Sequence, residues 1–175
     1  DILVLGGYTP DTTVLLRDIF RAGFRGKVLA YAYSVNQQMI GSLPHDVTEG
    51  IYTLAPSPAE GTTAFARVQR IVGNANPDPY TCQIYDQVNL ILMAMAVGGD
   101  GTGQVIHDNV RKVSQGGGDR VDNAVEGLRA IVAGRKVDYD GASGPCDFTD
   151  AGDITDCKFR YEQVRGGQQT LIRIS

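Results

Sequence analysis

The sequence is poor in the residues that build metal centres. It has three cysteines and two histidines in 175 residues, and no pair of cysteines has the Cys-x-x-Cys spacing. The histidines, His45 and His107, lie far from the cysteines along the chain. Zinc sites use clusters of these side chains at short, regular spacings. The sequence therefore predicts no zinc site.

Excess positive charge and long apolar runs are also missing. The formal net charge is −4, and no stretch gathers Lys and Arg, so neither a phosphate backbone nor an anionic membrane would be attracted. The longest apolar run, 90–97, is far shorter than the roughly 20 residues of a membrane-spanning helix. No recognisable signal peptide precedes the apolar run Ile2 to Leu5, and a mature secreted protein would have lost one. We expect no nucleic-acid partner and no membrane span in this chain.

Catalytic motifs are equally scarce. The segment 141–145 resembles a nucleophile elbow, but its second glycine comes one position too early, so Ser143 is interpreted as a turn residue. Gly6-Gly7 follows an apolar run, yet Gly-x-Gly-x-x-Gly is absent and Tyr8 would crowd a phosphate. We expect no catalytic residue and no cofactor.

Aspartates are frequent near the C-terminus and leave a calcium site as an alternative. However, Asp is common in turns, and the order of ligands in an EF-hand is not met. We therefore expect no metal here. The residues concerned are Asp138, Asp140, Asp147, Asp150, Asp153 and Asp156.

The hydrophobic pattern predicts an α/β protein. With 42% hydrophobic and 21% charged residues, the composition is that of a globular chain with a core. A strand over 2–5, a helix from Thr9-Pro10-Asp11 to Gly23 and a strand over 27–32 form the strand–helix–strand order of a parallel sheet. A further short strand is predicted over 47–54, and Pro56 and Pro58 mark a possible crossing between domains.

The second half of the chain is predicted to be helical before it ends in a β-hairpin. The segment 81–97 is so apolar that the helix must be buried nearly all round. Amphipathic helices are predicted around 65–72, 105–113 and 121–131, and alternation from 137 onward predicts strands with a turn at Gly166-Gly167.

Three tyrosines follow the first two strands. Tyr8 follows the first strand, and Tyr31 and Tyr33 come at the end of the second. Ligands bind outside the carboxyl ends of strands in open α/β sheets, and residues two apart on a strand share a face. The three are therefore candidate ligand-binding residues, with packing of Tyr31 or Tyr33 against a helix as the alternative.

Two cysteines flank a turn-rich segment. Cys146 and Cys157 enclose residues 147–156, between what the pattern predicts as two short antiparallel strands. A disulfide closing so short a loop would stabilise the fold by roughly 3 kcal/mol and would require an oxidising compartment. Two reduced thiols are the alternative. Cys82 is interpreted as a buried thiol.

Taken in order, several motifs resemble the leucine/isoleucine/valine-type periplasmic binding proteins of ABC transporters. The resemblance covers nearly the whole chain, and it lies in the order and spacing of the motifs. They are Gly6-Gly7-Tyr8, Arg21-Ala22-Gly23, Glu49-Gly50-Ile51-Tyr52, Tyr85-Asp86, Asp138 to Pro145, Asp147-Phe148 and Gly152-Asp153.

The resemblance implies the type I periplasmic-binding-protein fold, in which two Rossmann-like lobes enclose a ligand. The chain would hold only the C-terminal portion of each lobe: residues 1–54 in lobe 2, 55–158 in lobe 1 and 159–175 returning to lobe 2. The N-terminal half, with the Ser/Thr-rich loop that holds an amino-acid carboxylate in this family, would be absent. The implied function is ligand capture for an ABC permease in the inner membrane, and the implied location is the periplasm.

The resemblance also bears on the ligand. Tyr8 matches a position that lines the cleft in this family, and the acidic residue that receives an amino group should fall near Ala32. Tyr31-Ala32-Tyr33 offers no carboxylate, so affinity for ordinary α-amino acids should be at least tenfold lower. We expect a small carboxylate, an aromatic acid or an amino-acid-like ligand.

Two other functions are compatible with the same pattern. A ligand-sensing receptor domain of the same fold would be followed by a transmembrane helix. A Rossmann-type enzyme would reveal itself by a bound nucleotide or by catalytic residues outside this chain.

Overall fold

The computed structural model describes all residues, 1–175, and divides them into two compact units. Unit 1 comprises Asp1–Pro56 and Lys158–Ser175, and unit 2 comprises Ser57–Cys157. The chain therefore leaves unit 1 once, forms all of unit 2 and returns.

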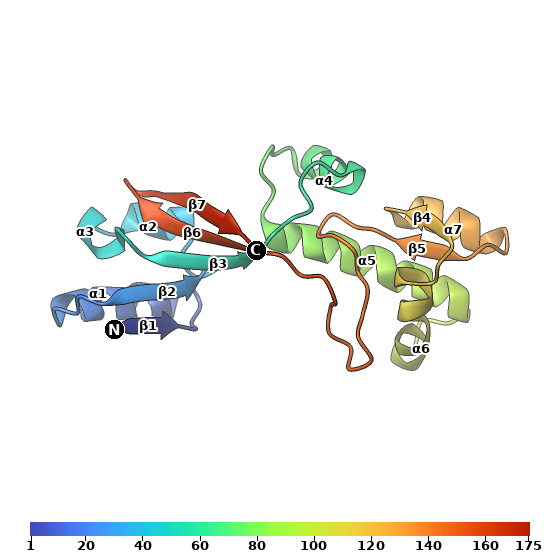
Figure 1. The fold of residues 1–175 in the computed structure, drawn as a ribbon, viewed down its shortest axis with the longest axis horizontal. Helices are drawn as coiled ribbons and strands as arrows, with labels where there is room; N and C mark the ends of the chain where they lie inside the picture. The colour runs from blue at the N-terminus through green and yellow to red at the C-terminus, as the bar shows by residue number, and fades with distance from the viewer. The chain divides into compact units, whose positions relative to one another are not determined.

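Unit 1 is a five-stranded mixed sheet in the order β1-β2-β3-β6-β7. Strands β1, β2 and β3 are parallel, whereas β6 runs antiparallel to both β3 and β7 (Figure 1). The strands are β1 (Ile2–Leu5), β2 (Lys27–Tyr31), β3 (Tyr52–Pro56), β6 (Phe159–Arg165) and β7 (Gln168–Ile174).

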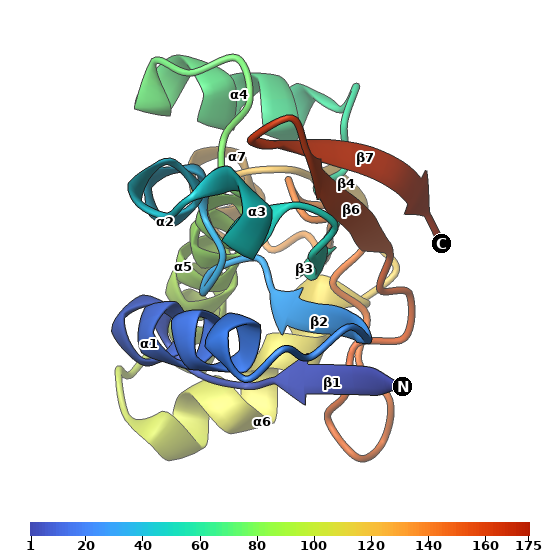
Figure 2. The ribbon, with the colours of Figure 1, turned by 90° about the vertical axis from the view of Figure 1, so that its left-hand side faces the viewer.

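Three helices cover one face of this sheet. They are α1 (Thr9–Arg21), α2 (Gln37–Ser42) and α3 (His45–Thr48). Figure 2 shows all three on the same side of the strands. Leu5 and Ala30 from the sheet pack with Leu16 of α1 and Met39 of α2 in one buried core. This face of the sheet carries the hydrophobic core of unit 1.

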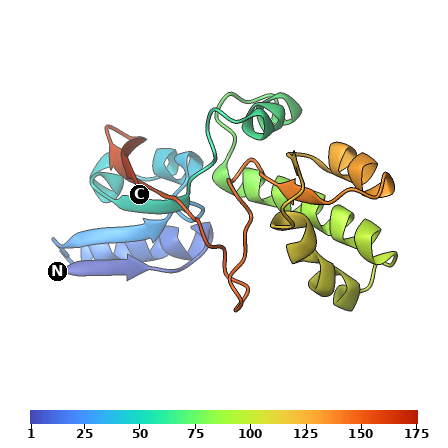
Figure 3. The ribbon, with the colours of Figure 1, turned by 45° about the vertical axis from the view of Figure 1, so that its right-hand side comes forward.

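Unit 2 is mainly helical and contains a short two-stranded parallel sheet. The long helix α5 runs through it, with α6 and α7 packed against it (Figure 3). Leu90 and Met93 of α5 meet Val113, Ala130 and Val137 in its core. The elements are α4 (Thr63–Val72), α5 (Pro79–Gly98), α6 (Gly103–Ser114), β4 (Asp119–Val121), α7 (Ala124–Val132) and β5 (Val137–Tyr139).

The predicted order of strands and helices is largely confirmed, and the bounds of several elements are corrected. The segment expected as a strand over 47–54 begins with the last two residues of helix α3, and its strand starts only at Tyr52. Pro44 is the N-cap of this helix, which therefore begins at His45. Val121 ends strand β4, so the next helix begins at Ala124, after Asn123 caps it. The segment around Cys146 and Cys157 forms one antiparallel bridge, Phe148 with Ile154, in place of two strands.

No helix of the structure combines the length and the apolarity that crossing a bilayer requires.

Candidate functional site

The three candidate tyrosines form one aromatic cluster on unit 1. The rings of Tyr31 and Tyr33 are stacked, with centroids 5.4 Å apart and planes at 7°. The ring of Tyr8 lies against Tyr33 at 5.7 Å and is tilted by 45°. We refer to Tyr8, Tyr31 and Tyr33 as the tyrosine cluster. Offset and tilted ring contacts of this kind are favourable for aromatic side chains.

Parallel pairing of β1 and β2 brings the cluster together. Leu5, near the carboxyl end of β1, is in register with Ala30 in β2, so the residues after both strands emerge at the same edge of the sheet. Tyr8 occupies the N-cap position of α1. The cluster therefore lies where the sheet opens.

A tight turn after β2 positions Tyr33. The strand ends at Tyr31 and does not reach Ala32, contrary to the prediction. The carbonyl of Tyr31 accepts hydrogen bonds from the backbone N–H groups of Ser34 and Val35, at 3.0 and 3.2 Å, and from the Ser34 hydroxyl at 2.8 Å. The Tyr33 ring thus meets that of Tyr31 through this turn and not through strand alternation.

Side-chain hydrogen bonds hold this turn against α1. The Thr9 hydroxyl donates to the carbonyl of Tyr33 at 3.2 Å, and the Asn36 amide donates to the Thr9 hydroxyl at 3.4 Å. Asn36 also caps α2 by accepting from the N–H of Met39 at 2.9 Å. The cluster is therefore supported by hydrogen-bonded structure on both sides.

The cluster is open to solvent. The exposed fractions are 73% for Tyr8, 42% for Tyr31 and 38% for Tyr33. More than half of the surface of Tyr31 and of Tyr33 is covered, so packing of either ring against a helix stays open as the alternative interpretation. Ala32 lies between them, and its N–H donates to the carbonyl of Leu54 in β3 at 3.0 Å. Part of each tyrosine side chain thus remains exposed for contact with another molecule.

The N-terminus of α1, beside the tyrosine cluster, adds a weak preference for negative charge. No side chain caps the N-terminus of α1, whose backbone dipole favours anions there. Asp11 in the first turn offsets part of this effect. The site can therefore stack a ring and tolerate a carboxylate.

A second polar arrangement, in unit 2, was not predicted from the sequence. Asp86 of α5 is 2% exposed and accepts four hydrogen bonds. They come from the Tyr139 hydroxyl and Ala142 N–H, each at 2.8 Å, and from the Ser143 N–H and hydroxyl at 2.7 and 2.5 Å. Ser143 is a turn residue, as predicted, and this contact fixes its turn.

Burial dominates the electrostatics of this group. It raises the pKa of Asp86, although the hydrogen bonds from Ser143, Ala142 and Tyr139 oppose the rise. Burial and the neighbouring Asp86 charge also raise the pKa of Tyr139. The sequence signal that could have indicated this hydrogen-bonded group was a single Asp within an otherwise apolar helix.

Unit 2 also has a polar pocket of about 400 Å³ beyond the ends of β4 and β5. Arg67 pairs with Asp122 at 2.7 Å, and Thr63 donates to the same carboxylate. Burial acts to raise the pKa of Asp122, but hydrogen bonds from Thr63, Asn123 and Arg67 outweigh it and lower the pKa. The cationic and acidic groups satisfy one another, so this arrangement ties α4 to the rest of unit 2.

The predicted disulfide is not formed in this structure, and the pairing stays a prediction. Cys146 is a buried thiol that donates to the carbonyl of Gly144 at 3.5 Å. Burial raises its pKa to about 12. The bridge between Phe148 and Ile154 folds the intervening loop back on itself, which brings the segments around both cysteines toward each other.

For protein recovered from an oxidising compartment, we expect reduction to add the mass of two hydrogens through opening of the Cys146–Cys157 bond. Intact-mass measurement before and after reduction checks this, and Cys157→Ser is the control that should show no gain. An unchanged mass for the unsubstituted protein would mean that no bridge forms.

The residues of unit 1 and unit 2 contain no group of three or more His, Cys, Asp or Glu side chains placed to hold a metal ion. The six aspartates near the C-terminus include Asp140, which pairs with Arg120 at 3.2 Å. The calcium alternative therefore gains no support from their arrangement.

No family model matches the chain. The chain is 34% identical over 105 residues to a chemotactic signal transduction system substrate-binding protein, BasB, of Halobacterium salinarum. This match covers 58% of this chain and 25% of BasB.

Solved structures are similar over nearly the whole chain at low sequence identity. A leucine-binding protein, LivK, of Thermotoga maritima has a TM-score of 0.67 at 17% identity, over 99% of this chain and 44% of its own. A solute-binding protein of Rhodopseudomonas palustris in complex with benzoate has a TM-score of 0.60 at 13% identity, and the match covers 99% of this chain and 42% of that protein. A branched-chain amino acid transporter protein of Thermus thermophilus with bound valine has a TM-score of 0.54 at 16% identity, and the match covers 98% of this chain and 45% of that protein.

The chain thus spans a quarter of the curated relative and less than half of each of these solved structures. The structural neighbours include substrate-binding proteins of branched-chain amino acid ABC transporters. From the mixed α/β architecture and these matches, we conclude that the chain has the type I periplasmic-binding-protein fold.

Proposed function

We propose that the chain belongs to a periplasmic solute-binding protein that captures a small ligand between two lobes and delivers it to an ABC permease in the inner membrane. Unit 1 would be part of lobe 2, and unit 2 part of lobe 1. The observation that carries the proposal is the exposed tyrosine cluster at the carboxyl ends of β1 and β2, where ligands bind in open α/β sheets. No catalytic group is needed for this role.

The chemistry of the cluster favours an aromatic or aliphatic acid as the ligand. Tyrosine faces stack on rings and phenols donate hydrogen bonds to carboxylates. Ala32, between Tyr31 and Tyr33, provides no carboxylate for an ammonium group. The benzoate complex among the structural neighbours shows that this fold accepts an aromatic acid. Leucine-type amino acids should bind more weakly.

The test is a binding screen on the full-length protein with benzoate, 4-hydroxybenzoate, short aliphatic acids, leucine and valine. A ligand that binds only the folded state raises the melting temperature. We expect the acids to give the largest shifts and Tyr33→Ala to weaken their binding about tenfold, because the ring stacks on Tyr31 and contacts Tyr8.

The matched control is Tyr161→Ala, which removes a tyrosine of the same unit that contacts Arg173 and lies outside the cluster. The affinity of the Tyr161→Ala variant for the acids should stay within twofold of that of the unsubstituted protein. Tight leucine binding with no response to any acid would contradict the ligand class. Equal affinities for both variants would contradict the site.

A sensory role is the second candidate, because the curated relative is described as part of a chemotactic signal transduction system. Cells that lack the gene distinguish the two roles. Loss of ligand uptake supports delivery to a permease, whereas loss of movement along a ligand gradient with uptake intact supports sensing.

A further inference from the structure

Unit 2 contains another cavity, of about 560 Å³, where α5, α6 and α7 end and β5 begins. Small-molecule sites in proteins usually have volumes of about 300 to 1,000 Å³. The cavity is lined by Val97, Val113, Ile131 and Val137 and by three basic residues. We call it the basic pocket. Its size alone is that of a ligand site.

The apolar part of the basic pocket is continuous with the core of unit 2. Val113 and Val137 are buried members of that core, and Ile131 packs against it. Val97 follows the buried Met93 by four residues, so it lies on the core side of α5. Nevertheless, Val97 is 40% exposed. The pocket is therefore an opening into the hydrophobic core of unit 2.

The backbone around the pocket prevents the chain from filling it. Gly116 and Gly134 both line the cavity. A Cβ at Gly116 would clash with the carbonyl oxygens of Lys112 and Val137. Gly134 ends α7 with a φ of 73°, a conformation that other residues rarely adopt. Neither position can carry a larger side chain, and unfilled apolar space is unfavourable, so an apolar ligand would stabilise this region.

The polar part of the basic pocket carries only positive charge. Lys112, Arg135 and Lys136 line it, and no Asp or Glu does. Arg135 is paired with Asp119, and the Lys112 ammonium donates to the side-chain oxygen of Asn109 at 2.8 Å. An ammonium group has three donors. Lys112 therefore keeps donors for a further partner, and we expect an anion to be attracted here.

Helix ends explain part of this charge, because cations near the C-terminus of a helix offset its dipole. Lys112 lies in the last turn of α6, and Arg135 follows the end of α7. Lys136 is placed differently, since it directly precedes β5. None of the ion pairs found in residues 1–175 involves Lys136. The charge of Lys136 is therefore without a structural role of this kind.

We propose that the basic pocket binds an amphiphilic anion, a small molecule with a carboxylate head and an apolar tail. The tail packs against Val97, Ile131 and the valines of the core, which removes apolar surface from water. The carboxylate accepts charge-assisted hydrogen bonds from Lys112 and Lys136. The pocket lies wholly in unit 2 and the tyrosine cluster in unit 1, so the site does not depend on the function proposed for the cluster.

Titration calorimetry of the full-length protein with decanoate tests the proposal. The double substitution Lys112→Gln with Lys136→Gln should weaken decanoate binding at least tenfold, because it removes both ammonium groups from the pocket. Both lysines are exposed, so folding is retained. Decanol, which has the same tail without a charge, should bind more weakly than decanoate and with equal affinity to both proteins.

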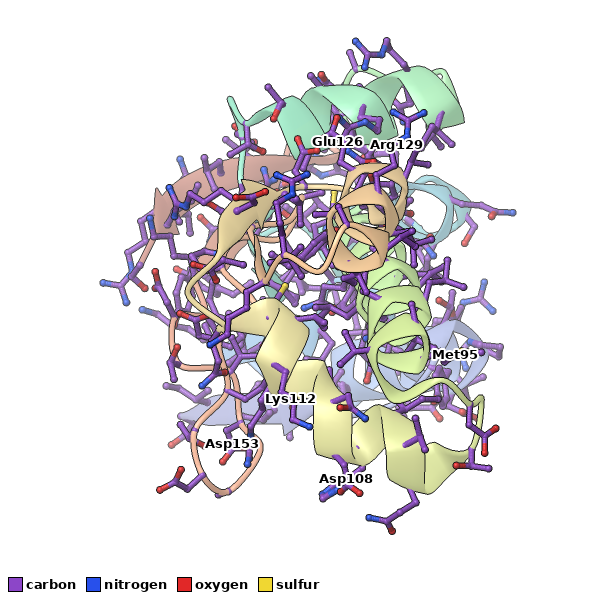
Figure 4. All side chains as sticks on the ribbon, turned by 90° about the vertical axis from the view of Figure 1, so that its right-hand side faces the viewer. Met95, Asp108, Lys112, Glu126, Arg129 and Asp153 are labelled. Atoms are coloured by element: carbon purple, nitrogen blue, oxygen red, sulfur yellow. The ribbon has the colours of Figure 1, made fainter.

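Arg129→Gln is the matched control, because it removes an exposed cation of the same unit that does not line the pocket. Figure 4 shows Arg129 on α7, well apart from Lys112 on α6. Decanoate affinity of this variant should stay within twofold of that of the unsubstituted protein. Equal weakening by Arg129→Gln and by the lysine variant would indicate general attraction by charge, and would overturn the proposal.

Tyr33→Ala separates the basic pocket from the tyrosine cluster, which is also proposed to bind acids. Decanoate affinity should stay within twofold in Tyr33→Ala, and the lysine variant should keep the benzoate affinity of the unsubstituted protein. If Tyr33→Ala weakens decanoate binding as much as the lysine variant does, or if decanoate does not bind at all, the basic pocket is not its site. Failure of benzoate alone to bind would contradict only the ligand class proposed for the cluster.

Discussion

Replacing Asp86 by alanine should lower the free energy of unfolding by about 3 to 5 kcal/mol, the largest effect we expect from a single substitution in unit 2. The alanine would leave the Tyr139 hydroxyl and the N–H groups of Ala142 and Ser143 buried without their acceptor. Each unsatisfied buried donor costs about 1 to 3 kcal/mol. Thermal unfolding of the full-length protein should register a drop of roughly 10 °C.

Two companion variants make this expectation specific. Asp108→Ala removes an exposed carboxylate from α6 and should leave the melting temperature nearly unchanged. Gly141→Ala should be destabilising, because a Cβ there would lie within 2.5 Å of all three carboxyl atoms of Asp86. If Asp86→Ala melts like Asp108→Ala, the four hydrogen bonds to Asp86 do not hold the turn.

Replacing Ala32 by glutamate should shift ligand preference toward α-amino acids. It would put a carboxylate between Tyr31 and Tyr33, at the position where the resemblance to leucine-type binding proteins implies an acidic residue. A hydrogen bond to a charged ammonium contributes about 1.5 to 3 kcal/mol, so leucine affinity should rise at least tenfold. Isothermal titration of the full-length protein with leucine and benzoate measures the change.

Ala32→Gln is the control, because it has the same length as glutamate and no charge. It should leave leucine affinity near that of the unsubstituted protein. If glutamate and glutamine have equal effects, size and not charge limits amino-acid binding. If neither alters any affinity, residue 32 lies outside the ligand site.

The elements that are local in sequence were predictable. Strand β1, helix α1 and the start of β2 follow from apolar periodicity and from Pro10 and Gly23, which act on their own neighbours. The tyrosine cluster was predictable from strand order alone, since parallel strands end at the same edge. The stacking of Tyr33 on Tyr31 through a turn was not predictable, because the turn is formed by hydrogen bonds to the Tyr31 carbonyl.

Contacts between distant segments could not be read from spacing. Asp86 and Ser143 are far apart in sequence, and only the packing of α5 against the end of β5 brings them together. Similarly, Arg67 gives no sign in the sequence of its partner Asp122. The prediction that the helix over 81–97 is buried nearly all round was wrong for this structure, in which Ile84 and Val88 of α5 are 57% and 50% exposed. Burial depends on what surrounds a helix, and its own apolar pattern does not supply those neighbours.

The neighbouring strands β3 and β6 have a consequence for the order of folding during synthesis. Pro56 is in register with Phe159, yet all of unit 2 lies between them in the sequence. A ribosome therefore releases β3 well before its partner β6, and closing so long an unfolded loop would cost on the order of 4 kcal/mol in chain entropy. Prior folding of unit 2 shortens that loop, so the central sheet of unit 1 should be completed last, after the inserted unit has formed.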